Sequence, residues 1–198
     1  ASNQPFSLIF WGPPGTGKTT LARILSREFK ADYFELSAIS SGVKQVREIL
    51  QKGKAAFESG RRSILFIDEI HRFTKSQQDA LLHAVEEGSI TLMGATTENP
   101  SFEVISPLLS RCRVLRLYPL SNQELENVLI RAMKEDIMLS QQNLVLEEEV
   151  KSLLFESCGG DARKMLNTLE LAVSLHTEDN PQLTKTDIRE ALQQKNVI

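Results

Sequence analysis

The sequence predicts an α/β fold in which a parallel β-sheet is sandwiched by helices, followed by a small all-helical domain. The first observation is an alternation of short apolar runs with segments of helical periodicity along residues 1–119. Such alternation is typical of parallel sheets whose crossover helices cover both faces. The second observation is a change at Pro119, after which helical spacing continues. We therefore predict one domain over 1–119 and a helical domain over 120–198.

The strands predicted in the first domain are short and apolar. The run Ile64–Ile67 is apolar at every position, as expected for a strand buried on both faces. Helices are predicted where apolar residues recur every three or four positions, and Gly88 is the expected stop of the third one. The expected strands cover about 6–11, 33–36, 64–67, 90–95 and 113–117, and the expected helices about 18–29, 43–59 and 76–87.

The second domain carries helix-start signals. Ser121 and Glu124 have the spacing of a capping box, in which each side chain bonds to the backbone of the other residue. Asp161 and Thr184 are suitable N-caps for two later helices. The expected helices cover about 122–137, 147–157, 162–176 and 185–194.

A glycine-rich stretch lies between the first predicted strand and the first predicted helix. It fits the phosphate-binding pattern G-x-x-x-x-G-K-[ST], and its residues are Gly12, Pro13, Pro14, Gly15, Thr16, Gly17, Lys18 and Thr19. The glycines let backbone N–H groups converge on phosphate oxygens, and the helix N-terminus adds partial positive charge. We expect Lys18 to reach the β- and γ-phosphates of a nucleoside triphosphate and Thr19 to bind Mg²⁺. Thr20 is expected to complete the nucleotide-binding residues.

Two acidic residues follow the most apolar strand. Asp68 and Glu69 come directly after Ile64–Ile67 and thus lie where ligands bind in open α/β sheets, at the carboxyl ends of the strands. A P-loop NTPase needs an acid there to hold Mg²⁺, a role that we assign to Asp68. Glu69 is well placed to polarise an attacking water. The alternative, a solvated strand end, is disfavoured by the spacing from the phosphate loop.

A threonine-rich turn ends the next predicted strand. Thr97 is expected near the same sheet edge, where its hydroxyl would orient the water or touch the γ-phosphate. The sequence leaves open the plainer reading, in which these residues form only a turn that enters Asn99-Pro100.

Composition restricts the function classes. The formal net charge is −3; residues 1–119 carry 15 Lys and Arg against 12 Asp and Glu, and residues 120–198 carry 8 against 14. Contacts with nucleic acid are therefore expected on the first domain. No apolar run approaches the ~20 residues of a membrane helix, so no membrane partner is expected. Cys112 and Cys158 lack metal-binding spacing, which favours reduced thiols in the cytoplasm.

These motifs together resemble the AAA+ ATPases of the clamp-loader-like branch. Leu109–Cys112 resembles that branch's Ser-Arg-Cys element, and Gly160–Arg163 resembles the sensor 2 element. The stretches 68–73, 75–79 and 94–102 are similar to the replication-associated recombination protein A and Werner-helicase-interacting family. The likeness extends from about 7 to 195.

The resemblance implies an ATP-dependent factor of DNA replication, recombination and repair that acts at stalled or gapped forks. It implies that Arg111 is an arginine finger acting on a neighbouring subunit's nucleotide, and that Arg163 senses the γ-phosphate. Ser37 falls where relatives keep a polar residue that restrains the catalytic glutamate. ATP and Mg²⁺ are the implied cofactors.

The implied partners are single-stranded, gapped or forked DNA, single-strand DNA-binding protein and further copies of the chain. Family resemblance gives a tetramer in a cytoplasmic, nucleoid-associated protein. The predicted helix at 43–59 faces a DNA channel in clamp-loader relatives, and its basic residues either contact phosphates or form an ordinary solvated face. They are Lys44, Arg47, Lys52 and Lys54.

The chain is expected to differ from the family in two segments, and two alternative functions stay open. The chain begins at Ala1, close to the first predicted strand, so we expect a fragment that lacks the family's upstream adenine-pocket segment and its C-terminal tetramer-forming domain. Such a fragment is expected to hydrolyse ATP weakly and to be monomeric. One rival function is a nucleotide-gated scaffold for DNA and protein with little turnover. The other is a small-molecule P-loop kinase, which the pair Asp68–Glu69 disfavours.

Overall fold

The structure, a computed structural model, describes residues 5–176 and 180–194. Contacts within the chain divide it into two compact units. The first consists of Ala1–Gly12 and Gly17–Leu117, and the second of Pro13–Thr16 and Tyr118–Ile198. The assignment of 1–119 as an ATPase core and 120–198 as a lid stays a prediction.

The first unit is built on a five-stranded sheet in the order β2-β3-β4-β1-β5, and every neighbouring pair is parallel. The predicted α/β class is thereby confirmed. Because all strands run the same way, their carboxyl ends meet at one edge of the sheet and their amino ends at the other. The strands are β1 Leu8–Trp11, β2 Asp32–Ser37, β3 Ser63–Asp68, β4 Thr91–Thr96 and β5 Arg113–Arg116.

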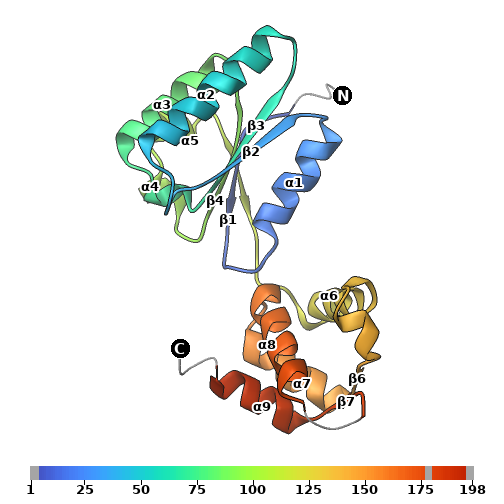
Figure 1. Cartoon of the computed structure of the whole chain (residues 1–198). Coiled ribbons are helices and arrows are strands. Elements are labelled where there is room, and N and C mark those ends of the chain that lie inside the picture. The colour runs from blue at the N-terminus through green and yellow to red at the C-terminus, as the bar shows by residue number, and fades with distance from the viewer. Residues whose placement is uncertain (1–4, 177–179, 195–198) are drawn as a thin grey trace. The chain divides into compact units, whose positions relative to one another are not determined.

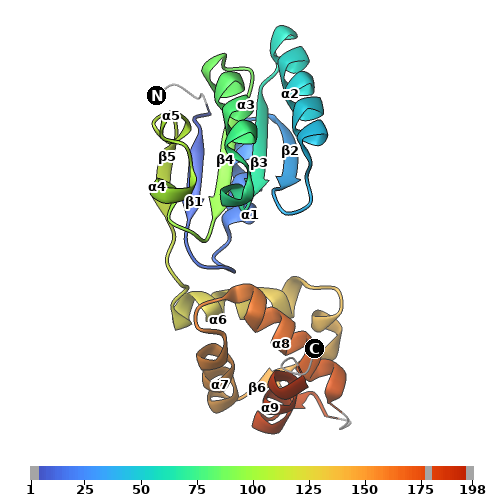
Figure 2. The same ribbon diagram turned by 90° about the vertical axis from the view of Figure 1, so that its left-hand side faces the viewer.

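Helices cover both faces of this sheet (Figures 1 and 2). Helix α1 (Lys18–Glu28) lies on one face, and α2 (Val43–Glu58) and α3 (Lys75–Glu86) lie on the other. Side chains of β3 alternate between the two resulting cores, since successive strand residues point to opposite faces. The α1 side receives Ile64 and Phe66, and the α2–α3 side receives Leu65 and Ile67.

Three short helical segments follow β3 and β4, and none of them was predicted. The 3₁₀ turn η1 (Ile70–Arg72) follows β3, and α4 (Pro100–Glu103) and α5 (Ser106–Leu109) lie between β4 and β5. The Asn99 side chain accepts a hydrogen bond from the Ser101 N–H at 3.0 Å and caps α4. Asn99-Pro100, where one of the two alternative interpretations placed only a turn, therefore begins a short helix.

The outer strand β5 is exposed at all four positions. Its arginines stack on two aromatic rings: the Arg113 guanidinium lies 4.5 Å from the ring centre of Phe6, which precedes β1, and that of Arg116 lies 4.9 Å from the ring centre of Trp11, the last residue of β1. Positive side chains on an edge strand oppose pairing with further strands, so these arginines protect the edge as well as covering the rings.

The second unit is mainly helical, as predicted. The capping box is present: the Ser121 N–H donates to Glu124 Oε2 at 2.8 Å. Asp161 caps its helix by accepting from the Lys164 N–H at 2.9 Å. Beside the predicted helices, the structure contains two parallel strands of two residues each, which were not predicted. The elements are α6 Asn122–Glu135, η2 Leu139–Gln142, β6 Val145–Leu146, α7 Glu148–Cys158, α8 Ala162–Leu175, β7 Gln182–Leu183 and α9 Lys185–Gln194.

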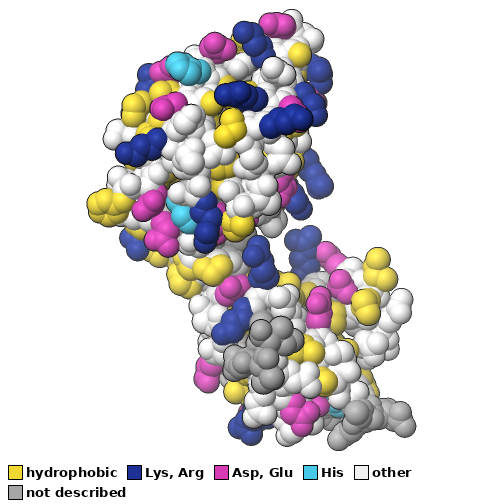
Figure 3. Space-filling model, turned by 60° about the vertical axis from the view of Figure 1, so that its left-hand side comes forward, with side chains coloured by type: hydrophobic (Ala, Val, Ile, Leu, Met, Phe, Trp, Pro, Cys, Tyr) yellow, Lys and Arg dark blue, Asp and Glu magenta, His cyan; other side chains and the backbone are white. Residues whose placement is uncertain are grey.

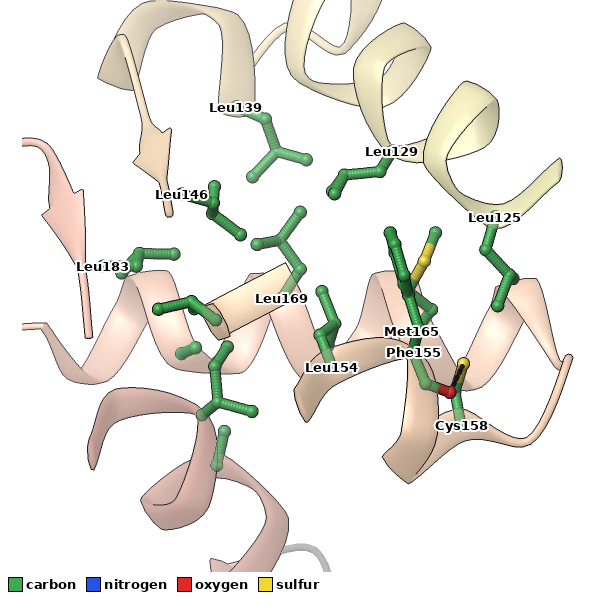
Figure 4. Packing of buried hydrophobic residues seen from close by; sticks show 14 residues of the cluster. Leu125, Leu129, Leu139, Leu146, Leu154, Phe155, Cys158, Met165, Leu169 and Leu183 are labelled. Carbon is green, nitrogen blue, oxygen red and sulfur yellow. Dashed lines mark hydrogen bonds between the residues drawn. The ribbon is translucent and has the colours of Figure 1, made fainter. Parts of the chain in front are cut away.

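A separate leucine-rich core holds this unit together (Figure 4). Leu125 and Leu129 of α6 share this core with Leu154 of α7 and Leu169 of α8, and all four are at most 1% exposed. Full burial of a leucine contributes roughly 1.5–3 kcal/mol relative to an exposed one. Within the described ranges, every helix is too short or too polar to cross a lipid bilayer.

Candidate active site at the carboxyl edge of the sheet

The predicted chemical groups converge because three parallel strands end together. Gly12 follows β1, Glu69 follows β3 and Thr97 follows β4. The Gly12 N–H donates to the Thr96 carbonyl at 3.2 Å, so the base of the phosphate loop is tied to the end of β4. Strand order places β4 between β1 and β3, which brings the loop after β4 between the other two.

Two glycines give the phosphate loop its local shape. A Cβ atom at Gly12 would lie 2.3 Å from the Leu117 carbonyl oxygen, so no larger residue fits there. Gly17 has a φ of 89° and is the N-cap of α1, a left-handed conformation that glycine adopts at little cost. Helix α1 therefore begins at Lys18, and its first N–H groups face the loop.

Lys18 is held at the loop. It is 8% exposed, and its Nζ donates to the Gly12 carbonyl at 2.8 Å. Thr16 closes the loop by donating from Oγ1 to the Pro13 carbonyl at 3.0 Å. Thr19 is half-buried, and Thr20 is exposed. Among the other loop residues, Pro14 is exposed, and Pro13, Gly15 and Thr16 are half-buried.

This donor set fits a polyphosphate. An ammonium group and the free N–H groups of a helix N-terminus are the groups that bind phosphate oxygens. Among the described residues, no group of three or more His, Cys, Asp or Glu side chains forms a metal cage. Mg²⁺ in nucleotide sites is normally held by one or two protein oxygens together with phosphates and water, which the Thr19 hydroxyl and the Asp68 carboxylate are able to provide.

Asp68 is the last residue of β3 and is half-buried. It lies opposite Ser37 in the parallel register, and its carbonyl accepts from the Ala38 N–H at 2.9 Å. Ser37 thus lies beside the acid pair. The Glu69 carboxylate instead contacts Thr97, which follows β4, and His71 of the adjoining 3₁₀ turn.

Glu69 has an unusual backbone. Its φ of 53° and ψ of 47° are left-handed, although it is not a glycine. Such a conformation costs about 1–3 kcal/mol and occurs most often at functional sites. The reversal starts η1 and directs the Glu69 carboxylate toward the end of β4, where Thr97 Oγ1 donates to Glu69 Oε2 at 3.4 Å.

His71 completes this cluster and was not predicted as a functional residue. Its Nδ1 lies 3.1 Å from Glu69 Oε2 and 3.0 Å from Thr96 Oγ1. The only sequence signal was its position two residues after Glu69, because the scattered histidines showed no common pattern.

Arg111 lies at the opposite edge of the sheet. It precedes β5 and borders a recess of about 880 Å³ that is lined by residues at the amino ends of β1, β3 and β4, among them Phe6, Arg62 and Thr91. Its guanidinium forms an ion pair with Glu86 and donates to the Pro107 carbonyl at 2.9 Å. Burial raises the pKa of the adjacent Cys112 thiol to about 11, so this thiol is protonated and unreactive at neutral pH.

The remaining predicted residues lie elsewhere. Arg163 is in the first turn of α8 in the second unit, and its side chain is exposed. The four basic residues of α2 are all exposed. On the face drawn in Figure 3, Lys and Arg side chains are dispersed among other residues rather than joined in one patch.

Family models match most of the chain. The ATPase family associated with various cellular activities (AAA) matches residues 8–120, and the AAA C-terminal domain matches residues 140–198. The chain is 50% identical to replication-associated recombination protein A of Escherichia coli (strain K12) over 175 residues, which cover 88% of this chain and 39% of that protein. It is 44% identical to ATPase WRNIP1 of Dictyostelium discoideum over 173 residues, which cover 87% of this chain and 20% of that protein. It thus spans less than half of either relative.

Solved structures share the fold. The RuvB Holliday junction branch migration motor of Thermotoga maritima matches with a TM-score of 0.70 and 25% identity, over 98% of this chain and 63% of that chain. The AAA domain of FIGL-1 in complex with ADP matches with a TM-score of 0.70 and 20% identity, over 96% of this chain and 71% of that chain. The second match concerns the fold alone.

Proposed function

The chain belongs to the ATPase family associated with various cellular activities, and on that premise we propose that it hydrolyses ATP to ADP and phosphate in DNA replication, recombination and repair. The observation that carries the proposal is the cluster at the carboxyl edge, where Glu69 and Thr97 meet beside the phosphate loop that holds Lys18. The similarity to replication-associated recombination protein A supports the biological setting, with stalled or gapped forks as the site of action.

The proposed chemistry is an in-line attack of water on the γ-phosphate. Glu69 takes a proton from the water as the water oxygen bonds to phosphorus, and the bond from that phosphorus to the β–γ bridging oxygen breaks. Lys18 and the N–H groups of α1 hold the phosphates, and Thr97 and Arg163 sense the γ-phosphate. A magnesium ion held by Thr19 and Asp68 would supply positive charge to the phosphate oxygens.

We propose that Arg111 acts on the nucleotide of another copy of the chain. It precedes β5, whereas the phosphate loop follows β1, and the two strands are parallel and in register from Leu8 with Arg113 to Trp11 with Arg116. A strand advances about 3.3 Å per residue, so a four-residue strand separates the two edges by roughly 13 Å. A guanidinium at the amino edge therefore serves a site on a neighbouring subunit, in a homo-oligomer for which family resemblance suggests a tetramer.

We propose that α2 contacts DNA. Single-strand DNA-binding protein is the proposed protein partner, and the proposed location is the cytoplasm, in association with the nucleoid. Lys44, Arg47 and Lys54 are spaced by three and seven residues, which places them along one side of the helix. Exposed Lys and Arg contact phosphates without a sequence code. Replacing these three residues and Lys52 by alanine is expected to abolish stimulation of the ATPase by DNA.

The test is ATP hydrolysis by the full-length protein, with and without single-stranded, gapped and forked DNA. Glu69→Gln is expected to bind ATP and to lose about 10²–10⁴-fold in kcat, the usual contribution of a general base. Lys18→Ala is expected to lose nucleotide binding in calorimetry. Glu58→Gln, which removes an exposed carboxylate of α2, is the matched control and should hydrolyse ATP normally.

The outcomes separate the rival functions. Normal ATP binding by the unsubstituted protein without turnover on any DNA would favour a nucleotide-gated scaffold. Transfer of the γ-phosphate to a small acceptor rather than to water would favour a kinase. Retained hydrolysis by Glu69→Gln would remove Glu69 as the water activator.

A further inference from the structure

His71 lies at the centre of the carboxyl-edge cluster without an assigned role. Its side chain is 15% exposed, and its Nδ1 atom lies between two oxygen atoms, Glu69 Oε2 at 3.1 Å and Thr96 Oγ1 at 3.0 Å. The backbone reversal at Glu69 brings the two side chains together. Ile70, which is fully buried, anchors η1 between them.

The hydrogen bonds of Thr96 favour Nδ1 as the ring nitrogen of His71 that carries hydrogen. Thr96 Oγ1 accepts from the Glu98 N–H at 3.0 Å and donates its own hydrogen to the Glu98 carbonyl at 3.2 Å. Its remaining lone pair is an acceptor, and a carboxylate oxygen is an acceptor as well. Both neighbours of Nδ1 thus require a donor, and a bare Nδ1 would place lone pairs against Glu69 at 3.1 Å.

The contacts of Glu69 are unequal on its two oxygens. Oε2 receives the Thr97 hydroxyl and faces the His71 ring, whereas Oε1 has no hydrogen-bond partner among the described residues. Two donors on one oxygen fix the carboxylate plane and leave the other oxygen to accept a proton. Thr96 is fully buried and its carbonyl accepts from Gly12, so the same cluster is continuous with the base of the phosphate loop.

We propose that His71 is a positioning residue for Glu69, which it holds to the end of β4 by sharing an Nδ1–H hydrogen between Glu69 Oε2 and Thr96 Oγ1. The proposal rests on the proposed ATPase activity for its kinetic consequence. Its structural content, the Nδ1–H tautomer and its two acceptors, does not depend on turnover. Through Thr96, the position of the carboxylate is linked to the end of β4, directly before Thr97, the proposed γ-phosphate sensor.

The kinetic test replaces His71 by residues that keep or lose the donor. His71→Ala is expected to lower kcat by about 10- to 100-fold, by analogy with the loss that follows when the hydrogen-bond partner of a metal ligand is removed. The KM for ATP should change by less than about threefold, because the phosphate loop is intact. His71→Asn places an amide N–H near the position of Nδ1 and should recover most of the loss, whereas the longer His71→Gln should not.

Two controls separate positioning from a general structural role. His83→Ala removes an exposed histidine of α3 and should leave kcat unchanged. In the Glu69→Gln background, His71→Ala should cause no further loss, because a residue that acts through Glu69 has nothing left to position. A full independent loss in that background, or full kcat in His71→Ala, would refute the proposal. If His71→Ala does not fold, the comparison of His71→Asn with His71→Gln carries the test.

A nucleotide-free measurement tests the tautomer itself. Long-range ¹⁵N–¹H correlation spectra of the histidine rings distinguish Nδ1–H from Nε2–H. We expect Nδ1–H for His71 in the protein without ATP, and a change of its ring ¹⁵N shifts in Thr96→Val and Glu69→Ala but not in Glu58→Gln. An Nε2–H tautomer would overturn the proposal even if the protein is an active ATPase. An Nδ1–H tautomer in a protein without turnover would instead leave the contact intact and refute the proposed activity.

Discussion

The two edges of the sheet in the first unit hold their charged groups in different ways. At the carboxyl edge, the Glu69 carboxylate contacts Thr97, which the strand order brings beside it, and His71, which the local backbone reversal at Glu69 brings beside it. At the amino edge, Arg111 is held by Glu86 and a local carbonyl and borders an open recess. The carboxyl edge therefore resembles a site with its own supporting contacts, and the amino edge resembles a surface prepared for another molecule.

The different roles of the two edges are tested most directly by mixing a variant of one edge with a variant of the other, so that subunits of both kinds assemble together. Arg111→Ala is expected to lower kcat by about 10³-fold or more, as for other arginine fingers. Mixed with Glu69→Gln, which is also inactive, it should regain activity, because some interfaces then combine an intact Glu69 with an intact Arg111. With equal amounts and random assembly, about a quarter of the sites are complete. The measurement is steady-state ATPase activity of the full-length variants over a range of mixing ratios.

The control for this experiment is Arg27→Ala, which removes an exposed arginine from the last turn of α1. It should be active alone and should need no partner. A mixture of Arg111→Ala with Glu69→Gln that shows only the average of the two separate activities would mean that Arg111 does not act on a neighbouring site.

Much of the carboxyl edge was predictable, because parallel strands place the residues that follow them at one edge. The phosphate loop, Asp68 and Thr97 were found from that rule and from residue type. His71 was not, since its contact depends on the left-handed backbone of Glu69 and on the 3₁₀ turn after it. Hydrophobic periodicity carries no information about such a reversal.

A substitution in β4 is expected to disturb the carboxyl edge alone. A Cβ atom at Gly94 would lie 3.1 Å from Ile70 Cδ1 and 3.3 Å from Ile70 Cγ2, closer than most real contacts. Gly94→Val should therefore displace Ile70 and with it η1, destabilising the protein by about 1–3 kcal/mol, as overpacking usually does. We expect kcat to fall by about tenfold through misplacement of Glu69. Urea unfolding and ATPase assays measure the two effects.

Gly94→Ala adds a smaller side chain than Gly94→Val. It should therefore change both the free energy of unfolding and kcat by less. Gly94→Val still carries an intact amino edge, so it should rescue Arg111→Ala in a mixture as Glu69→Gln does. Failure to rescue, in a protein that remains folded, would mean that the two edges are not independent.

The shortest helices and strands were not predicted because they have too few residues to show a pattern. The ion pair at the amino edge was not predicted because its two residues are far apart in the sequence. Helices α4 and α5 have four residues each, fewer than a periodicity window requires, although Asn99-Pro100 and Ser106-Pro107 carried start signals. The two-residue strands β6 and β7 are shorter still. The ion pair of Arg111 with Glu86 joins residues from separate segments, which no local pattern encodes.

The smallest effect is expected from Glu86→Gln, which removes the carboxylate that holds Arg111 at its own subunit. Both side chains are more than a third exposed, so the pair contributes at most about 0.5 kcal/mol to stability. Release of the guanidinium should instead raise kcat by up to about threefold at low ionic strength, and added salt should cancel the gain because it screens the same attraction. Glu87→Gln, the exposed neighbour, is the matched control and should show neither effect. A fall in kcat for Glu86→Gln would mean that the ion pair presents Arg111 to the neighbouring site, in which case the amino edge is organised by supporting contacts in the same way as the carboxyl edge.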